Sequence, residues 1–581
     1  MGIPHLTHSL SPYGDKVVLP QNPANHENAI IDGPSLAYHV FYVCIARRTG
    51  ARSALEAAPT YQELGQAAVD WLEQIEQYGL KMYVANTGPF RLVTFKALNK
   101  DDLPSRMENT SASKTDVLSA VISSNRLKDL PAPPFLVPAV IEMLLESRYS
   151  SLVAVIPGEA DAYCAEAARQ HGGVIFTSDS DLLVHDLGKS GKVILFRDLD
   201  TIHLPSRGKC LKTQEYHPAG IAKRFELPNL VKLAFFMSQD HHKSLTENIR
   251  LAGKDTPMSA GFAEFAEEYG SLPKLSKLAM AETIDKSNVS EILARLDPRI
   301  SEIVHLVRVK ENQEAPSDLQ DSDNLNMYLP YLIDDPTRTS AWRSGVSIRA
   351  QAYSLLRLLN SSITQVTEFE RKGTRVAGTI VELDSTSSAV ALLEDCVKSL
   401  KDDLGQHPSL SKAARWRAVA TRHVCQSNLD NEKPPPLSSD INRLVTGSRE
   451  GVLSWSFIHA SAQMQASLYS LRMLSQISTV VQSFLEGADN AILTPLQTLV
   501  NLLNDLPSLR ELLDEKTSRD NSEIEAARAA VLSTLQSLGI TQDAEPLSKK
   551  KKKRKKKGEH TGERTPPGVA WRSNNMFSNL S

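Results

Sequence analysis

The sequence contains few cysteines and no long hydrophobic run, and each absence excludes a class of protein. Its 581 residues include five cysteines, which are scattered without the spacing of a disulfide framework or a zinc motif. A chain with so few, unpaired cysteines is typical of a reducing compartment. No apolar run is long enough to span a bilayer, and the N-terminus shows no secretory signal pattern. We therefore expect an intracellular protein of two or three domains, because single cores rarely grow beyond about 250–300 residues.

The net charge is positive in one segment and negative over the rest of the chain taken together. The formal net charge is −3, and the run Lys549–Lys557 contributes +9, so the other residues together carry −12. The folded part is thus unlike a protein that binds duplex DNA through a basic face. The run predicts a disordered Lys-rich tail over residues 546–581. Such a tail acts as a nuclear or nucleolar signal, as a polyanion tether or as both, unless it is merely a solvated tail.

Two pairs of acidic residues each follow a predicted buried strand. The strands are the apolar runs Leu152–Ile156 and Val174–Phe176, and the segment between them, Ala162–Gln170, has helical composition before a glycine pair. This pattern predicts a strand–helix–strand unit with parallel strands and a right-handed connection. The acidic residues lie just beyond the two strands: Glu159 and Asp161, then Asp179 and Asp181.

A third apolar run, Asn28–Asp32, also ends in an acidic residue and precedes the predicted helix Ser35–Ala46. Because the carboxyl ends of parallel strands meet at one edge of a sheet, we expect these carboxylates to gather there. Crowded carboxylates raise one another's pKa values unless a cation neutralises them, and oxygen ligands suit Mg²⁺ or Mn²⁺. An isolated acidic pair is usually a helix cap or a turn, but three such strand ends predict a metal site.

These residues carry a family resemblance. The start Met1–Pro4, the segment Ile31–Tyr38 and the two acidic pairs, in this order, resemble the flap endonuclease/XPG superfamily of PIN-like nucleases over about residues 1–60 and 130–240. The later segment Tyr331–Trp342 is similar to the Asteroid branch of that superfamily. The resemblance implies an α/β, PIN-like domain in which helices flank a central, mostly parallel sheet, followed by a mainly helical region.

The resemblance also implies a two-metal site. In the superfamily, acidic residues at matching positions hold two Mg²⁺ or Mn²⁺ ions over the scissile phosphate. The ions lower the pKa of an attacking water and stabilise charge on the attacking and leaving oxygens. Asp240, after the apolar run Leu233–Gln239, matches the last metal-site aspartate. The catalytic set implied for this chain is then Asp32, Glu159, Asp161, Asp179 and Asp181, and the metal-ligating set consists of the same residues together with Asp240.

Nucleic-acid contacts follow from the same resemblance. Gly2 matches a glycine near the substrate, and Tyr38 matches an aromatic residue that stacks on a nucleobase. Arg47 and Arg48 follow on the same predicted helix, where a superfamily basic residue meets phosphate. Arg106 opens a polar segment that matches the helical arch. Ordinary alternatives stay open, because Tyr38 fits an amphipathic helix face and the arginine pair fits a solvated helix end.

The sequence departs from the superfamily in two places. The superfamily has a further strand-end aspartate, but no acidic residue directly follows the predicted strand Lys81–Val84. Asp101–Asp102 resembles the missing continuation, so Val84–Lys100 is either an insertion or an error in the assembled coding sequence. Downstream, His241–His242 replaces a glycine-punctuated hairpin that holds duplex DNA. These histidines lack a Cys or His partner at zinc-site spacing, which favours solvated or capping residues.

Beyond residue 245 the apolar residues recur at helical spacing, as is typical of packing faces. The stripes are Met464, Leu468, Leu471 and Leu474, and then Leu496, Leu499, Leu503 and Leu506. Thr494 and Pro495 before the second stripe predict a capping box with proline at the first helical position. Lys433–Pro436 predicts a linker or surface loop. We divide the chain into a nuclease domain (1–244), two helical regions (245–432 and 433–545) and the tail (546–581).

Together these features predict a nuclear, Mg²⁺- or Mn²⁺-dependent, structure-specific nuclease. It would hydrolyse phosphodiester bonds in DNA with single-stranded character during repair or processing. The helical region or the basic tail would bind protein partners, and no membrane contact is expected. The alternative is a catalytically weak or inactive adaptor with a nuclease fold, favoured by the missing acid, the weakly basic arch and the lost hairpin. An RNA-processing nuclease would use the same chemistry.

Overall fold

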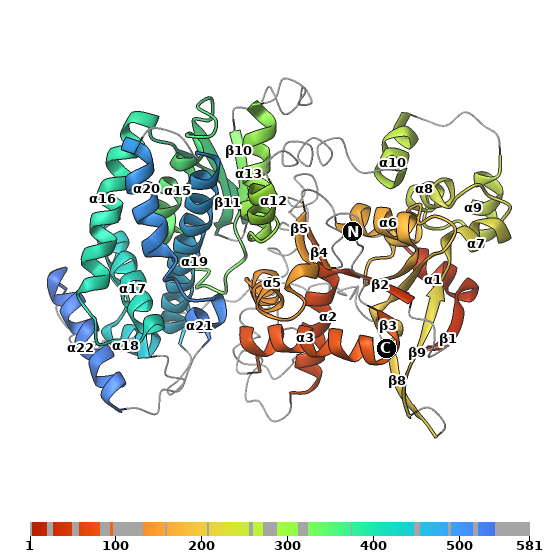
Figure 1. Ribbon diagram of the computed structural model, residues 1–581, viewed down its shortest axis with the longest axis horizontal. Coiled ribbons are helices and arrows are strands. Elements are labelled where there is room, and N and C mark those ends of the chain that lie inside the picture. The colour runs from red at the N-terminus through yellow and green to blue at the C-terminus, as the bar shows by residue number, and fades with distance from the viewer. Residues whose placement is uncertain are drawn as a thin grey trace, which may run out of the picture. The chain divides into compact units, whose positions relative to one another are not determined.

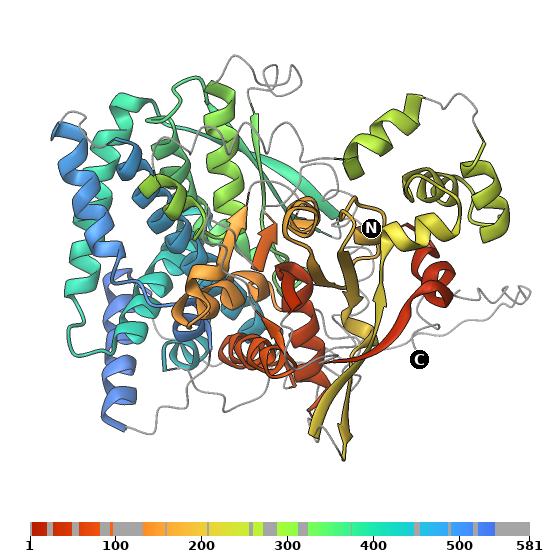
Figure 2. The ribbon, with the colours of Figure 1, turned by 45° about the vertical axis from the view of Figure 1, so that its right-hand side comes forward.

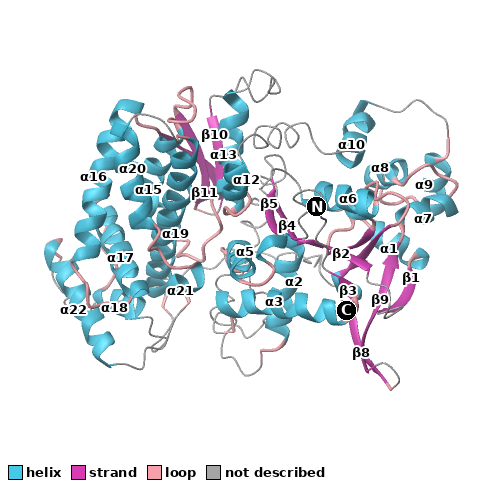
Figure 3. Ribbon diagram, viewed as in Figure 1, coloured by secondary structure: helices cyan, strands magenta, loops and turns pink. Residues whose placement is uncertain are grey.

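The computed structural model describes residues 3–19, 27–48, 57–81, 93–96, 132–156, 160–205, 208–254, 260–270, 287–311, 324–373, 375–446, 454–485, 490–514 and 521–540. In this part of the chain a mixed nine-stranded sheet and a three-stranded sheet are packed with helices (Figures 1 and 3). The predicted fold class, an α/β domain followed by a mainly helical region, is confirmed. The predicted Lys-rich tail lies outside the described residues.

The large sheet is mostly parallel. Its strand order is β1-β9-β7-β6-β2-β4-β5, with β3 paired to β2 and β8 paired to β9. The five neighbours from β7 to β5 are parallel, whereas β9 runs antiparallel to β1, β7 and β8. A long hairpin of β8 and β9 extends from the sheet (gold in Figure 2). The strands are β1 (Asp15–Leu19), β2 (Glu27–Asp32), β3 (Leu80–Lys81), β4 (Val93–Lys96), β5 (Val153–Ile156), β6 (Gly173–Thr177), β7 (Gly191–Leu195), β8 (Asp200–Leu204) and β9 (Gly208–Tyr216).

Side chains alternate along the central strands between two hydrophobic cores. Ile31 of β2 belongs to one core cluster and its neighbour Ile30 to the other, and Phe176 and Ile175 of β6 divide in the same way. Strands buried on both faces read as continuous apolar runs, which is why the sequence reveals them. Helices α2 (Gly33–Ala46), α3 (Tyr61–Gln77) and α5 (Leu136–Glu146) contribute to the first core; α1 (Leu6–Leu10), α6 (Ala160–His171), α7 (Pro218–Arg224) and α8 (Val231–Gln239) contribute to the second.

The predicted strand–helix–strand unit is present as β5, α6 and β6. Helix α6 is followed by Gly172 and Gly173, both with positive φ (67° and 106°), a backbone conformation that glycine adopts without strain. β5 and β6 lie parallel in one sheet as predicted, with β2 and β4 between them. The carboxyl ends of β2, β4, β5 and β6 therefore share one edge of the sheet, where open α/β folds place their sites.

The strand that follows α3 is interrupted. Leu80 of β3 lies opposite Glu27, 53 residues earlier, whereas Val93 of β4 lies opposite Ile31, 62 residues earlier. β3 and β4 thus share one side of β2 with nine extra residues inserted between them. The prediction that Val84–Lys100 is one insertion is wrong in extent, because β4 lies inside that range and supplies the strand between β2 and β5. Asp101 and Asp102 lie outside the described residues.

The C-terminal half is mainly helical, with one small sheet in the order β10-β11-β12 (Figure 3). β10 and β11 are parallel, and β11 and β12 form an antiparallel pair. The elements are α9 (Leu245–Ala252), α10 (Ala260–Gly270), α12 (Ser287–Leu293), α13 (Pro298–Glu311), β10 (Asn324–Tyr328), α15 (Val346–Leu356), β11 (Gln365–Lys372), β12 (Arg375–Glu382), α16 (Thr386–Gly405), α17 (Lys412–Asp430), α18 (Ser438–Thr446), α19 (Trp455–Phe484), α20 (Asn490–Leu503), α21 (Leu509–Leu513) and α22 (Asn521–Ser537).

The two predicted leucine-rich stripes are packing faces of α19 and α20. Met464, Leu468, Leu471 and Leu474 are buried, as are Leu496, Leu499 and Leu503. The predicted helix start is wrong, because α20 begins at Asn490 and Pro495 lies inside the helix. The apolar face extends further toward the N-terminus than the capping pattern suggests. Lys433–Pro436 lies, as predicted, in a loop between α17 and α18.

The helical region packs directly on the sheet domain within one unit, residues 1–541. The ring of Phe135 stacks on Tyr469 of α19 with centroids 4.5 Å apart. Arg472 of α19 forms an ion pair with Glu142 of α5. The edge strand β5 donates the Val155 N–H to the carbonyl of Ala294 at 2.8 Å. This last contact covers a sheet edge that would otherwise present unpaired backbone groups.

Candidate active site

Asp32 is held at the junction of β2 and α2. It is the N-cap of α2, and its carboxylate accepts hydrogen bonds from the Ser35 hydroxyl at 2.5 Å and the Ser35 N–H at 3.4 Å. Thr177, the last residue of β6, donates its hydroxyl to the same carboxylate at 2.6 Å. Asp32 is only 3% exposed. The helix-cap role and the predicted site role therefore coincide in one buried side chain.

Asp179 and Asp181 follow β6 in a turn that Thr177 organises. The Asp179 N–H donates to the Thr177 hydroxyl oxygen at 2.9 Å, and the Asp181 N–H donates to Asp179 Oδ1 at 3.0 Å. Thr177 thus links the ends of β2 and β6. The second oxygen of Asp179, Oδ2, has no hydrogen-bond partner among the described residues. The prediction that these strand-end acids gather at one edge is met for Asp32, Asp179 and Asp181.

The cluster is electrostatically crowded. Burial raises the pKa of Asp32 and the neighbouring Asp179 charge raises it further, while the hydrogen bonds from Ser35 and Thr177 oppose the rise. Burial, with the Asp179 charge, raises the pKa of Asp181 from its ordinary value of 3.8 to about 6. Such shifts are expected where carboxylates approach one another without a neutralising cation. They are also common at functional sites.

Two groups that the sequence did not point to donate hydrogen bonds to Asp181. Its Oδ1 accepts a hydrogen bond from the Ile3 N–H at 2.9 Å, and its Oδ2 accepts one from the Tyr269 hydroxyl at 3.3 Å. Tyr269 lies in the last turn of α10 and packs on the ring of His185, with centroids 5.1 Å apart. Burial lowers the pKa of His185 to about 4, so its imidazole is neutral at physiological pH. No local motif marks Tyr269, which is 88 residues away in sequence.

The other predicted ligands are placed differently. Asp161 lies in the first turn of α6, beyond β5, and Glu159 lies outside the described residues. Asp240 is at the C-terminal end of α8, where it accepts a hydrogen bond from the His242 N–H at 3.0 Å and pairs with Lys243 at 3.5 Å. These hydrogen-bond and ion-pair contacts of Asp240 are local and do not join it to the Asp32 cluster. His241 Nδ1 lies 3.3 Å from the Met237 carbonyl, which fits the capping role predicted for it.

The predicted nucleic-acid contacts lie on α2. Tyr38 is 46% exposed and Tyr42, one turn later, is 63% exposed. Exposed aromatic rings at this spacing form a stripe on one helix face. Arg47 follows the helix end, and Arg48 pairs with Glu63 at 2.5 Å. Tyr42 is a candidate contact that the sequence reading did not name. Gly2 and Arg106 lie outside the described residues.

The carboxylate oxygens of the cluster are of the type that binds a hard divalent cation. Asp32, Asp179 and Asp181 supply only oxygen, which is what Mg²⁺ and Mn²⁺ prefer. The raised pKa values of Asp32 and Asp181, and an Asp179 Oδ2 that has no hydrogen-bond partner among the described residues, are consistent with a site that a cation would complete. Within the described residues, however, no group of three or more His, Cys, Asp or Glu side chains is arranged to hold a metal ion. The two-ion site thus stays a prediction.

Comparison with known proteins gives the class of this domain. A family model described as "XPG domain containing" matches residues 132–383. The match begins just before α5 and ends just after β12, so it includes β5, α6 and the Asp179–Asp181 turn. With the observed sheet and strand-end acids, it defines an XPG-like nuclease-fold domain. No solved structure matches the chain.

A curated relative extends this likeness to most of the chain. "Asteroid homolog 1" of Schizosaccharomyces pombe is 22% identical over 522 residues, which cover 86% of this chain and 88% of that protein. The chain is therefore similar to an Asteroid protein over most of its length, and its residues 132–383 match the XPG domain family. In the part that the structure describes, no helix combines the length and the apolar character needed to cross a membrane.

Proposed function

We propose that this protein is a metal-dependent, structure-specific nuclease that hydrolyses phosphodiester bonds in DNA with single-stranded character. Mg²⁺ or Mn²⁺ is the proposed cofactor, and repair or processing of DNA is the proposed setting. The proposal rests on one observation above all, the link from Asp32 through Thr177 to Asp179 at the shared carboxyl edge of β2 and β6. We further propose that the run Lys549–Lys557 directs the protein to the nucleus or nucleolus.

The residues present would hold the cofactor as follows. Asp179, with its unpartnered Oδ2, and Asp181 would be the first ligands, with Asp32 beside them and Glu159 and Asp161 from the end of β5 completing the set. A bound cation would lower the pKa of an attacking water and would neutralise negative charge on the reacting phosphate. Before binding, the carboxylates must lose their protons, which for Asp181 requires a pH above about 6.

The protein's own contribution is positioning. The Ser35 and Thr177 hydroxyls fix the orientation of Asp32, and the turn that Thr177 organises fixes Asp179. The Ile3 N–H and the Tyr269 hydroxyl hold Asp181. Such preorganisation lets a site bind charge without rearranging at the moment of reaction. Tyr38 and Tyr42 offer two rings on which bases of a single strand can stack regardless of sequence.

Cleavage of end-labelled DNA by the purified full chain tests the proposal. The substrates are single strands, flaps, overhangs and duplexes, with a single-stranded RNA as a further arm, each with Mg²⁺, with Mn²⁺ or with EDTA. We expect metal-dependent cutting by the wild type and none by Asp179→Asn/Asp181→Asn. Asp186→Asn is a matched control, because Asp186 lies in the same loop but is exposed and bonds only the Gly188 N–H. Cutting by the double variant would refute the assignment.

A non-catalytic adaptor with a nuclease fold is the second candidate. It is favoured by the fact that oxygens of Asp32 and Asp181 already accept hydrogen bonds from protein donors. Thermal unfolding with and without Mn²⁺ separates the two. A ligand at 100 times its Kd stabilises the folded state by about 2.7 kcal/mol, so a functional site should raise the unfolding midpoint. An unchanged midpoint, together with no cleavage of any substrate, would establish the adaptor.

A further inference from the structure

The end of the Asteroid-like segment Tyr331–Trp342, residues 337–340, lines a cavity of about 310 Å³ that shares no residue with the acidic cluster. We call it the basic cavity. Its other walls are Arg343 and Ser344, the end of α17 with the loop that follows it (427–436), and His459 with Gln463 of α19. This volume is at the lower end of the range of about 300–1,000 Å³ found for small-molecule sites. The cavity therefore has room for one small ligand.

The lining of the basic cavity has a single sign of charge. Arg338, Arg343 and Lys433 line it, and no Asp or Glu does. The remaining lining is almost entirely hydroxyl, amide and imidazole groups, and only prolines and aliphatic stems are apolar. A ligand that is large and apolar does not suit such walls, because the polar groups would lose their partners on binding. An anion suits them.

The three cationic side chains of the lining have N–H groups that are still available to a ligand. Arg338 pairs through Nε with Asp335 at 3.4 Å, and its two terminal nitrogens have no partner among the described residues. Arg343 uses Nε for Glu370 at 2.7 Å and Nη2 for Thr379 at 2.7 Å, which leaves Nη1. The Lys433 ammonium donates to the Thr339 hydroxyl at 2.9 Å and has no carboxylate partner among the described residues. Charge-assisted donors of this kind bind phosphate oxygens strongly.

His459 adds a buried imidazole to the lining of the basic cavity. Its side chain is 4% exposed, and its fully buried Nδ1 has no hydrogen-bond partner among the described residues. A buried polar atom without a partner is costly unless something else satisfies it. Burial, and then the charges of Arg338, Arg371 and Lys433, lower the pKa of His459 to about 4, while the Asp335 charge opposes them. The imidazole is therefore neutral at physiological pH, and the positive charge of the lining comes from Arg338, Arg343 and Lys433.

The wall that carries Arg338 is held in place before binding. Arg371 forms a buried ion pair with Asp334, with nitrogen–oxygen distances of 2.7 and 2.8 Å. The same guanidinium donates to the carbonyls of Pro336 and Arg338, at 3.4 and 3.1 Å. The Trp342 indole donates to the Pro330 carbonyl at 2.7 Å. A wall fixed by these contacts loses little conformational entropy when the cavity binds a ligand.

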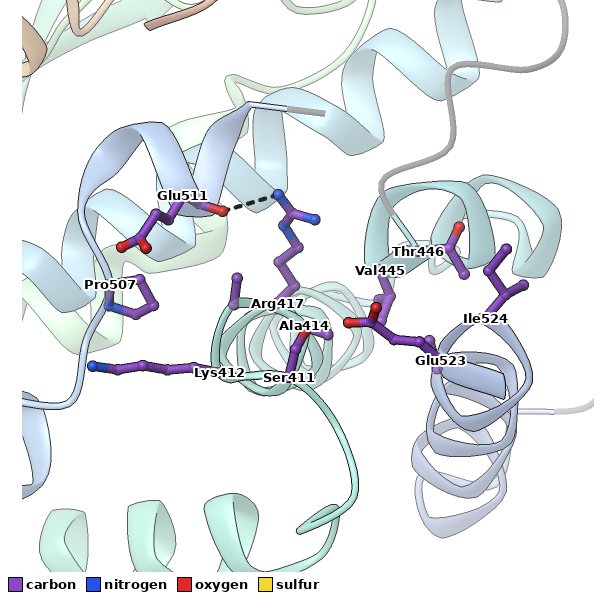
Figure 4. Close-up of a pocket in the computed structure, with 12 residues that line it drawn as sticks. Ser411, Lys412, Ala414, Arg417, Val445, Thr446, Pro507, Glu511, Glu523 and Ile524 are labelled. Carbon is purple, nitrogen blue, oxygen red and sulfur yellow. Dashed lines mark hydrogen bonds between the residues drawn. The ribbon is translucent and has the colours of Figure 1, made fainter. Parts of the chain in front are cut away.

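A second, larger cavity provides a contrast. It measures about 360 Å³ and is also lined by two cations, Lys412 and Arg417 (Figure 4). Here Glu511 and Glu523 line the walls as well, and Arg417 donates to the Glu511 carbonyl at 3.2 Å (Figure 4). Lys412 pairs with Asp505 at 3.1 Å. Because two carboxylates line this cavity together with its two cations, the lining has no excess of positive charge and no comparable preference for anions.

We infer that the basic cavity binds a phosphate group, either free phosphate or the phosphate monoester of a ligand no larger than a mononucleotide. Arg338, Arg343 and Lys433 would hold the phosphate oxygens. The site does not depend on the proposed nuclease activity, because it shares no residue with the acidic cluster. Nothing in its lining selects a base, so recognition is of the phosphate.

The test is calorimetric titration of the full chain carrying Asp179→Asn/Asp181→Asn, in EDTA, so that the acidic cluster cannot contribute through a metal. The probes are inorganic phosphate, dAMP and deoxyadenosine. We expect phosphate and dAMP to bind and deoxyadenosine not to bind. A larger affinity for dAMP than for phosphate would assign the site to a monoester, and equal affinities to free phosphate.

The variant Arg338→Gln/Lys433→Gln should weaken the binding of both phosphate probes at least tenfold. Arg338 is exposed and Lys433 is half-buried in a surface loop, so the fold should persist, which circular dichroism checks. Lys433→Glu alone should also abolish binding. Arg295→Gln is the matched control, because Arg295 is similarly exposed and pairs with Glu291 at 3.1 Å outside the cavity. The inference is overturned if neither phosphate probe binds at millimolar concentration, if the double variant binds as well as its parent, or if deoxyadenosine binds as well as dAMP.

Discussion

Neutralising Asp181 should stabilise the metal-free protein at neutral pH. A pKa that rises from 3.8 to about 6 on folding, at about 1.4 kcal/mol per unit, corresponds to about 3 kcal/mol. The folded state binds the proton of the Asp181 carboxyl more tightly than the unfolded state does, so protonation of Asp181 stabilises the fold. This stabilisation is fully present below pH 3.8 and is lost as the pH rises through about 6. Asp181→Asn carries no charge to lose. Its carbonyl can still accept from the Ile3 N–H, and its amide can donate to the Tyr269 oxygen.

Thermal unfolding in EDTA at pH 4 and pH 7.5 measures the effect. With an unfolding entropy of about 2.1 cal/mol/K per residue over roughly 500 residues, 3 kcal/mol raises the midpoint by about 3 °C. We expect Asp181→Asn to gain this at pH 7.5 and almost nothing at pH 4, and Asp186→Asn to gain nothing at either pH. Added Mn²⁺ should reverse the order by stabilising only the wild type. A variant that is less stable than the wild type at pH 7.5 in EDTA would refute the reasoning.

Three further results are expected. Tyr269→Phe removes a donor that holds Asp181 charged, so it should cost about 1 kcal/mol at pH 8 and nearly nothing at pH 4, as followed by the thermal midpoint. Arg371→Met leaves the buried Asp334 unpaired and should cost about 3–5 kcal/mol in denaturant unfolding. Arg169→Met removes a solvent-exposed ion pair with a 2.6 Å contact, which water screens, so it should cost far less in the same assay. Equal losses at the two arginines would contradict the account.

The parts of the fold that the sequence reveals are those with strong local signals. β2 and β6 are buried on both faces, so their apolar runs stand out, and Asp32, Asp179 and Asp181 directly follow them. Because parallel strands share one carboxyl edge, the meeting of these acids could be derived without coordinates. Thr177 could have been found too, since it directly precedes the acidic turn and a strand-end hydroxyl commonly bonds the following N–H groups.

Features set by tertiary packing could not be derived in this way. β4 has only four residues and follows an insertion, so its place between β2 and β5 depends on pairing with strands distant in sequence. Tyr269 reaches Asp181 because of how α10 packs, which no spacing encodes. Pro495 suggests a helix start by its local chemistry, but α20 begins at Asn490, one turn before the proline. In each case long-range packing overrides the local preference.

The measurement that tests the central claim most directly is single-turnover cleavage of the best DNA substrate by Asp181→Asn and Asp186→Asn, side by side with the wild type in Mg²⁺. Both variants remove one acid from the same loop, and only Asp181 belongs to the cluster. We predict a rate loss of at least about 10³-fold for Asp181→Asn, on the scale of losing a key electrostatic group, and a rate within twofold of the wild type for Asp186→Asn. Equal rates for the two variants would contradict a nuclease site at the edge of β2 and β6.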